Sequence, residues 1–227
     1  MAVIMSKIFT LPSSGISGTL LSDLTEGSIV LIPENGVNAE FYIAKHDYES
    51  GLNGAGRTLL LRRDTYGSSV FGSTNTYANS TVNSILNNEY KALFTSEIQD
   101  LIGETKFYYT PGDADYNVTT LSRSVFLLSA TEFGAPENET IYNGYRTEGT
   151  ALPTASIIIY DSTPTIVMQY TRTPMYTTGS SRYIIVLNTN GEFPSFYYNQ
   201  SVPYRPAFTL PSNAVFDPTT KEFKGVA

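Results

Sequence analysis

Three oxygen-bearing side chains stand at alternate positions in the segment Asp113-Ala-Asp115-Tyr-Asn117. This spacing reproduces the first three ligand positions of an EF-hand calcium loop, because Ca²⁺ binds hard oxygen ligands. The match then ends, since Val118 stands where the loop needs Gly and Ser124 where it needs a bidentate Glu. We therefore expect a solvated turn rich in Asp and Asn. A calcium site of another type at these residues is kept as the alternative, and no other metal and no cofactor are predicted.

Few residues are available for hydrolytic chemistry. The chain has no cysteine and one histidine, which removes thiol nucleophiles and thiolate metal sites. There is no G-x-S-x-G motif, and a Ser-His-Asp triad would have to use His46, for which we expect a local hydrogen bond instead. Glu132, Glu137 and Glu139 lie in or beside one loop. They could supply the paired carboxylates of a glycoside hydrolase if their separation in space is suitable.

A glycine-rich segment from Gly51 to Thr58 matches the spacing of a phosphate-binding loop, with Arg57 in place of the lysine. Such a loop holds phosphate at the N-terminus of the helix that follows it. Here the next residues, Leu59 to Arg63, have the pattern of a strand. We therefore expect a loop between two strands rather than a phosphate site.

Aromatic residues gather in the last third of the chain among Ser, Thr, Asn and Arg. Tyrosine offers a rigid apolar face and a polar tip, which suits recognition surfaces and contact with sugars. The same residue also fills half-buried sheets, so burial in the core is the competing interpretation for each of them. The predicted ligand-binding residues are Tyr170, Arg172, Tyr176, Tyr183, Phe196, Tyr197, Tyr198 and Tyr204.

Composition excludes several classes of protein. The 227 residues include 14 Lys and Arg against 21 Asp and Glu, a formal charge of −7, and charged residues make up only 15%. Nucleic acid is not expected as a partner, because phosphate binding needs clustered basic residues. No apolar run approaches the length of a membrane span, and the N-terminus lacks the basic region of a secretory signal. The many aromatics argue against disorder.

Apolar periodicity predicts a chain that is mostly antiparallel β with a two-helix insert, an α+β domain. A hairpin is expected where Asn35-Gly36 joins strands at 28–32 and 40–44, and another where Asn190-Gly191 joins 183–187 to 192–198, whose Pro194 favours an edge position. Helical spacing predicts one helix over 81–94, capped by Asn79 or Ser80, and a second beginning at Thr95. Further strands are expected at 58–62, 106–109, 125–129, 156–160 and 165–170.

Several segments resemble an uncharacterised domain family that is frequent in gut-associated Gram-positive bacteria, their phages and prophages. Its members carry an F-L-L-S-x-x-E strand, an R-[ST]-P segment and a terminal R-P-A-F-x-L, preceded by a helix with an S-x-[IL]-x-x-x-L-N-like start. The resemblance spans roughly residues 18–211. The corresponding segments here are Ser80–Asn87, Phe126–Gly134, Tyr170–Pro174 and Tyr204–Pro211, and the segment 41–60 is similar to the phage-associated branch.

The resemblance implies a C-type-lectin-like fold, related to that of formylglycine-generating enzymes. The oxidase activity of those relatives needs Cys, which this chain lacks. The resemblance therefore implies a non-enzymatic protein of the phage or prophage virion surface, made in the host cytoplasm. Its role would be receptor or glycan binding at the tail or baseplate, or capsid decoration. The alternative is a carbohydrate- or peptidoglycan-active enzyme that uses the loop carboxylates.

The expected organisation is a single lectin-like domain at 20–215, flanked by an N-terminal arm at 1–19 and a C-terminal tail at 216–227. Because both flanks have little periodicity, we expect them to dock onto partner subunits rather than extend the core. The partners would be other virion structural proteins and possible host cell-surface glycans, without nucleic acid or membrane. The protein would be a homo-oligomer or be bound to an oligomeric assembly.

Overall fold

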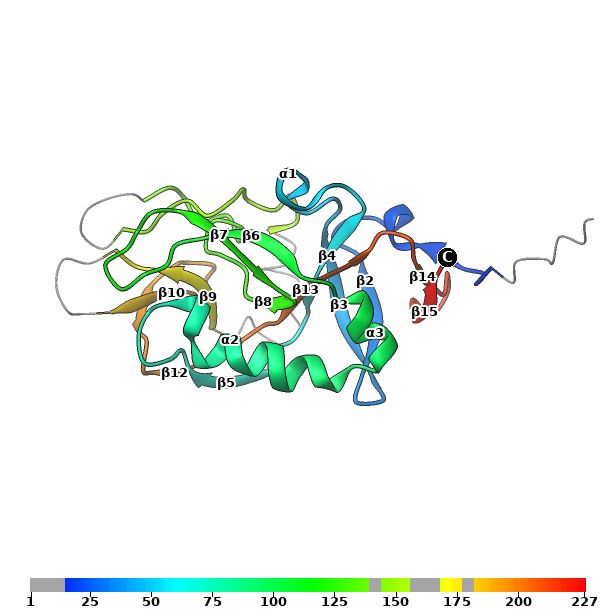
Figure 1. Ribbon diagram of the computed structural model, residues 1–227, viewed down its shortest axis with the longest axis horizontal. Coiled ribbons are helices and arrows are strands. Elements are labelled where there is room, and N and C mark those ends of the chain that lie inside the picture. The colour runs from blue at the N-terminus through cyan, green and yellow to red at the C-terminus, as the bar shows by residue number, and fades with distance from the viewer. Residues whose placement is uncertain (1–14, 139–143, 156–167, 177–181) are drawn as a thin grey trace, which may run out of the picture.

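A computed structural model describes residues 15–138, 144–155, 168–176 and 182–227. Five antiparallel strands form the central sheet, in the order β2-β3-β4-β13-β8 (Figure 1). The strands are β2 (Ile29–Glu34), β3 (Val37–Lys45), β4 (Arg57–Arg62), β13 (Ala207–Pro211) and β8 (Val125–Phe126). The sheet joins the front of the chain to its last fifth, so the fold is closed by contacts between residues far apart in sequence.

The predicted hairpin between β2 and β3 is confirmed. Asn35 and Gly36 both have positive φ, 49° and 78°, as a tight two-residue turn with the twist of the strands requires. Alternate β2 residues are buried, and β3 buries Phe41 to Ala44 without interruption. The hairpin therefore contributes one wall of the main core.

The described residues form four smaller antiparallel sheets besides the central one. One sheet joins β9 (Gln169–Pro174), β10 (Tyr183–Leu187) and β11 (Ser195–Tyr197), and another joins β1 (Thr19–Leu20), β14 (Ala214–Phe216) and β15 (Phe223–Val226). The other two are the pairs β5 (Gly67–Val70) with β12 (Ser201–Tyr204), and β6 (Thr105–Tyr109) with β7 (Thr119–Arg123). In Figure 1 the β9–β11 sheet lies at one end of the molecule and the β14–β15 pair at the other.

The helical insert is found where the apolar spacing predicts it. It begins with α2 (Thr81–Ile85) and continues through a π-helical turn (Leu86–Tyr90) and a 3₁₀ turn (Lys91–Leu93), and α3 (Ser96–Leu101) follows. Ser80 Oγ accepts a hydrogen bond from the Asn83 amide at 3.0 Å, and Thr95 caps α3 in the same way. Short helical turns also occur at α1 (Ser50–Asn53), 21–23 and 77–79.

The α+β prediction is confirmed at this level: the protein is mostly antiparallel sheet with few helices. Some strand bounds differ. β8 ends at Phe126, and β9 begins at Gln169 and continues through the predicted R-T-P motif to Pro174, four residues beyond the expected end. The predicted strand at 156–160 lies outside the described residues.

The C-terminal segment corrects one prediction. The sequence predicts that residues 216–227 dock on a partner and do not extend the core, and the second part of this prediction is wrong. Phe216 is completely buried, its ring packs edge-on against Phe223, and β15 pairs with β14. Burial of Phe216, its contact with the half-buried Phe223 and the β14–β15 pairing fix the segment to the body of the protein. The N-terminal arm is attached in its described part, where Thr19 pairs with Phe216; residues 1–14 lie outside the description.

The main core is rich in aromatic rings. The ring of Phe208 packs edge-to-face with those of Phe41 and Phe94 at the central sheet, with centroid distances of 5.2 and 5.3 Å. Such arrangements align the positive ring edge with the negative face of the neighbour. A second, smaller cluster of Ala130, Ala135, Tyr145, Met175 and Ile185 lies against β10. Among the described residues, no helix is long and apolar enough to cross a lipid bilayer.

Candidate functional site

The two faces of the β9–β11 sheet have different environments. Residues that alternate along a strand point to opposite faces. Ile184 and its cross-strand partner Phe196 pack against the main core. Ile185, paired with Ser195, and Tyr183, paired with Tyr197, therefore share the other face. This second face is the one that carries the candidate site.

A pocket of about 380 Å³ opens on that face. Its floor consists of Tyr145, Met175 and Ile185, which are 5%, 4% and 2% exposed and belong to the smaller hydrophobic cluster. Tyr183 and Phe193 are half-buried and pack against the same cluster. The lining is completed by the polar residues Asn138 and Ser195 and by Pro194. The described residues that line the pocket include two tyrosines and a phenylalanine and carry no charged side chain.

The floor of the pocket is held by hydrogen bonds to backbone carbonyl groups. The Tyr145 amide donates to the Asn138 carbonyl at 2.7 Å, and the Tyr145 hydroxyl donates to the Pro136 carbonyl at 2.6 Å. The Met175 amide donates to the Tyr183 carbonyl at 3.0 Å. Because these bonds fix the residues before any ligand arrives, the pocket is preformed.

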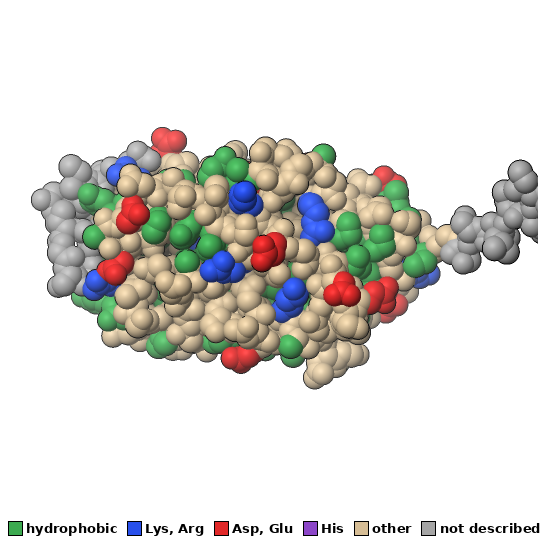
Figure 2. All heavy atoms as spheres, in the orientation of Figure 1, with side chains coloured by type: hydrophobic (Ala, Val, Ile, Leu, Met, Phe, Trp, Pro, Cys, Tyr) green, Lys and Arg blue, Asp and Glu red, His purple; other side chains and the backbone are tan. Residues whose placement is uncertain are grey.

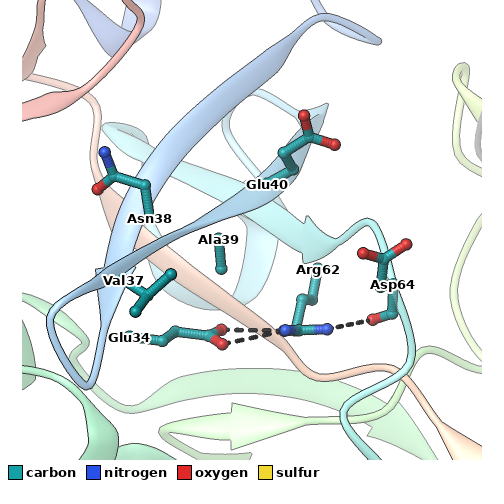
Figure 3. Close-up of a pocket in the computed structure, with 7 residues that line it drawn as sticks. All are labelled: Glu34, Val37, Asn38, Ala39, Glu40, Arg62 and Asp64. Carbon is teal, nitrogen blue, oxygen red and sulfur yellow. Dashed lines mark hydrogen bonds and ion pairs between the residues drawn. The ribbon is translucent and has the colours of Figure 1, made fainter.

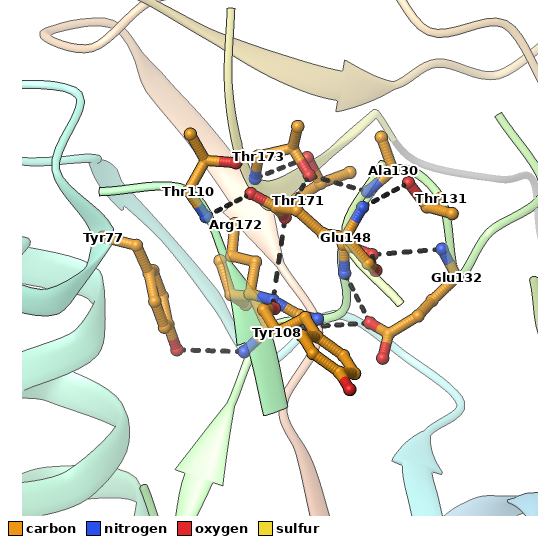
Figure 4. Close-up of polar contacts among 12 residues, drawn as sticks. Tyr77, Tyr108, Thr110, Ala130, Thr131, Glu132, Glu148, Thr171, Arg172 and Thr173 are labelled. Carbon is orange, nitrogen blue, oxygen red and sulfur yellow. Dashed lines mark hydrogen bonds and ion pairs between the residues drawn. The ribbon is translucent and has the colours of Figure 1, made fainter. Parts of the chain in front are cut away.

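Beside the pocket lies a buried ion network, shown in Figure 4. The Arg172 guanidinium on β9 is fully buried and donates to Glu132 Oε2 at 2.7 Å, with Glu148 Oε2 at 3.8 Å. It also donates to the backbone carbonyls of Tyr108 and Leu127. Arg172 therefore ties β9 to β6 and to the loops that contain Glu132 and Glu148.

Both carboxylates of the network have further donors. Glu132 accepts from the Ser129 amide at 2.7 Å and from the Tyr48 hydroxyl. Glu148 accepts from the Thr110 amide at 2.7 Å and from the Thr173 hydroxyl at 2.8 Å. These bonds offset much of the cost of removing the charges from water.

The network shifts several ionisation equilibria. Burial raises the pKa of the Glu148 carboxyl, and the nearby Arg172 charge lowers it only in part. Burial also raises the pKa of the Tyr48 hydroxyl well above its usual value, and the Glu132 charge adds to the rise. For Arg172, burial lowers the pKa, but the charge of Glu132 and its neighbours outweighs burial and raises it overall. The arginine is therefore a permanent buried cation.

Three of the predicted ligand-binding residues belong to the interior. Tyr170 is 1% exposed, Arg172 0% and Tyr204 3%. Tyr170 and Tyr204 pack in the main core, and Arg172 holds the ion network, so none of the three presents a surface to a ligand. The prediction that these three residues bind a ligand is therefore wrong, and the competing interpretation, burial in the interior, applies to them.

The other five are only partly brought together. Tyr183 lines the pocket, and Tyr197 lies beside it on the same face, while Phe196 and Tyr198 pack against the main core. Tyr176 belongs to a separate cluster, where its ring lies 4.2 Å from that of Tyr116 between centroids and 5.5 Å from the Arg146 guanidinium.

The side chains of the Asp113–Asn117 turn, for which a calcium site is the alternative interpretation, have partners within the protein. The Asp113 carboxylate is paired with the Arg182 guanidinium, at 2.6 Å from Nε. Asp115 Oδ1 accepts from the amide and side chain of Asn117 at 3.1 and 3.0 Å, as in an Asx turn. Within the described residues no group of three or more His, Cys, Asp or Glu side chains could hold a metal ion.

The described carboxylates and motifs considered for catalysis lie in different environments. Glu132 is fully buried, Glu137 is exposed, and Glu139 lies outside the described residues. His46 makes the expected local hydrogen bonds, to Thr58 Oγ1 at 2.9 Å and the Leu24 carbonyl at 2.8 Å. The glycine-rich loop leads into β4, where Arg57 Nη2 donates to the Thr209 carbonyl.

A second pocket of about 380 Å³ lies over the β2–β3 hairpin (Figure 3). Both carboxylate oxygens of Glu34 lie 3.1 Å from Arg62 Nε, and Arg62 Nη1 donates to the Asp64 carbonyl. Glu34 also accepts from the buried Tyr90 hydroxyl. The charges of Glu34 and Arg62 in this second pocket are therefore already paired within the protein. The pocket on the β9–β11 sheet is for this reason the better candidate.

Most residues of the pocket on the β9–β11 sheet could not be identified from the sequence. Tyr145, Met175 and Ile185 have no distinctive motif, and Asn138 lies in a loop. The one available signal was the alternation along 183–187, which places Tyr183 and Ile185 on the same face of a strand. The other lining residues could not be grouped from the sequence, because Asn138, Tyr145, Met175 and the segment 183–195 are well separated along the chain.

Comparison with known proteins gives one result. A family profile described as "Domain of unknown function (DUF6273)" matches residues 55–212, about 70% of the chain. No curated protein and no solved structure matches it. The matched segment contains β4 to β13, and with them the candidate pocket and the ion network.

Proposed function

The chain belongs to the DUF6273 family, and we propose that it is a non-enzymatic domain that binds a neutral carbohydrate in the pocket between Tyr145 and Phe193. The observation that carries the proposal is the lining: a preformed apolar floor with aromatic rings and an uncharged polar rim. A sugar ring has an apolar face of C–H bonds and an edge of hydroxyl groups. The first suits the negative face of an aromatic ring, and the second suits amide and hydroxyl groups.

Charge favours a neutral ligand over an acidic one. The described lining contains no Lys or Arg, and the chain carries a formal charge of −7. A net negative protein repels anionic partners at long range. Figure 2 shows one face of the molecule, where charged side chains are scattered over a surface that is largely polar and uncharged. An uncharged glycan therefore fits this lining better than an acidic polysaccharide.

We place this binding at the surface of a phage or prophage virion, in receptor binding at the tail or baseplate or in capsid decoration. The support is the resemblance of the 41–60 segment to the phage-associated branch of the family, whose members are frequent in gut-associated Gram-positive bacteria and their phages. Other virion proteins would be its partners, in an oligomeric assembly, with the N-terminal arm at 1–19 as the docking segment. Mass spectrometry of purified particles tests the placement, which fails if the protein is absent from them.

A C-type-lectin-like arrangement is the finer fold that we propose. It is supported by an antiparallel α+β body in which loops, rather than sheet centres, supply Asn138 and Tyr145 to the pocket. An experimental structure that superimposes on lectin domains would support it. A different strand topology would remove it without affecting the pocket.

Binding to a glycan microarray, followed by calorimetric titration of the strongest neutral glycan, tests the binding function. Phe193→Ala removes a pocket wall, whereas Phe223→Ala makes the same change in a half-buried ring at the other end of the molecule. We expect Phe193→Ala to raise Kd at least about 10-fold and Phe223→Ala to leave it within about 2-fold. Absence of binding to every neutral glycan, or equal losses in both variants, would overturn the proposal.

The enzyme alternative keeps a direct test. Since Glu132 is committed to Arg172 and Tyr48, the alternative depends on Glu137 and Glu139. Turnover of cell-wall glycans by the wild type, lost in Glu137→Gln or Glu139→Gln, would favour it. Binding without turnover favours the non-enzymatic function.

A further inference from the structure

Tyr197 is the exposed aromatic ring next to the pocket. Its side chain is 45% exposed, and among the described residues it is the aromatic one in the set of exposed large apolar side chains. It lies outside the pocket lining but on the same face of β11 as Ser195, which does line the pocket. A single exposed apolar side chain is normal on a protein surface. What distinguishes Tyr197 is its position, because its ring packs on Tyr183, which lines the apolar pocket.

The Tyr197 ring is held in place before any ligand binds. Its centroid lies 4.2 Å from that of Tyr183, and the two hydroxyl groups are hydrogen-bonded at 2.7 Å. The Tyr197 amide donates to Gln200 Oε1 at 3.2 Å, and its carbonyl accepts from the Gln200 amide at 3.1 Å. A ring fixed in this way loses little conformational entropy when a partner stacks on it.

Tyr183 connects the two features, because it lines the pocket and also packs on Tyr197. A ligand that fills the pocket and continues across β11 therefore meets a second aromatic surface directly at the rim. We propose that Tyr197 forms a second sugar subsite, so that the ligand is an oligosaccharide of at least two units rather than a single sugar. This inference rests on the proposed carbohydrate binding and adds the length of the ligand.

The test compares chain lengths on a microarray that carries the mono- to hexamers of glucose, N-acetylglucosamine, galactose and mannose, with Kd measured by calorimetry for the series that bind. We expect the affinity of the wild type to rise about 2- to 10-fold from monomer to dimer, the range for one aromatic stacking contact. Tyr197→Ala should abolish that rise. Tyr197→Phe, which keeps the ring and loses the hydroxyl, should retain it.

The possible failures are distinct. Equal affinity for monomers and oligomers, or a rise with length that Tyr197→Ala does not change, overturns the second subsite and leaves the pocket intact. Absence of binding to any member of any series, at any length, overturns the carbohydrate function and the subsite with it. Thermal unfolding of each variant confirms that the comparison is made between folded proteins.

Discussion

Replacement of Arg172 by Met is the perturbation for which the structure gives the clearest magnitude. Met approximates the length of the aliphatic part of the side chain and removes the charge. The change leaves Glu132 and Glu148 buried without their cation, although each keeps a backbone amide donor. It also leaves the Tyr108 and Leu127 carbonyls without the guanidinium donor.

Removing one partner of a buried ion pair costs about 3–5 kcal/mol, because the remaining charge is not compensated. For a domain of this size each kcal/mol lowers Tm by about 2–4 °C, so we expect Arg172→Met to lower Tm by about 6–20 °C. Native proteins have a total free energy of unfolding of about 5–15 kcal/mol, so this single substitution removes a large fraction of it.

Arg63→Met is the matched control. Arg63 Nη1 is 2.5 Å from Glu40 Oε2, shorter than the 2.7 Å of the buried Arg172–Glu132 pair, but the two side chains are 20% and 42% exposed. Water screens such a pair, and its loss costs within about 1 kcal/mol. Calorimetry and urea denaturation of both variants give the comparison.

A loss from Arg172→Met no larger than that from Arg63→Met would refute the reasoning, since burial is then not what gives the network its strength. The double variant Arg172→Met with Glu132→Gln gives a second check. If the two groups interact directly, the double variant should be more stable than the sum of the single losses predicts. Simple additivity would contradict the pairing.

Three further predictions concern stability. Burial raises the pKa of Glu148 above its ordinary 4.5, so the contribution of this carboxyl to the free energy of unfolding falls as pH rises above about 4.5. Glu148→Gln should remove that part of the pH dependence, measured by urea denaturation between about pH 4 and 8. An unchanged slope of unfolding free energy against pH would contradict the assignment. Gly112→Ala should cost at least about 1 kcal/mol and more than Gly36→Ala, because both have positive φ but only at Gly112 would a Cβ come within 2.7 Å of a backbone oxygen; equal losses would show that the close approach is not important. Ser80→Ala should destabilise the protein by about 1 kcal/mol through loss of the α2 cap, while Ser84→Ala, within the same helix, should stay within about 0.5 kcal/mol; a Ser80 loss as small as that would exclude the cap.

Local signals were sufficient for much of the fold. The Asn35-Gly36 turn and the apolar runs beside it predict the β2–β3 hairpin, and the spacing from Val82 to Phe94 predicts the helical insert. These elements follow from residues close in sequence. The pairing of Thr19 with Phe216, by contrast, joins residues from the two ends of the chain, and no local pattern indicates it.

The candidate site was predicted less well, for a related reason. Residue type marked Tyr170, Arg172 and Tyr204 as ligand-binding, but burial is decided by which face of a strand points inward. The partner of Arg172, Glu132, lies 40 residues earlier, so the ion network could not be expected from either motif alone. The pocket likewise arises only when the loop with Tyr145 meets the β9–β11 sheet.

The central claim, that a carbohydrate occupies the pocket over Met175, is tested most directly by NMR of the protein labelled with ¹³C at methionine methyl groups. Met175 is on the pocket floor, whereas Met168 packs against the main core, and Met175→Leu assigns the signal. Titration with the strongest neutral glycan should shift the Met175 methyl resonance in proportion to binding and leave that of Met168 in place. Saturation of the protein with glycan while the Met175 resonance stays unchanged would contradict the claim.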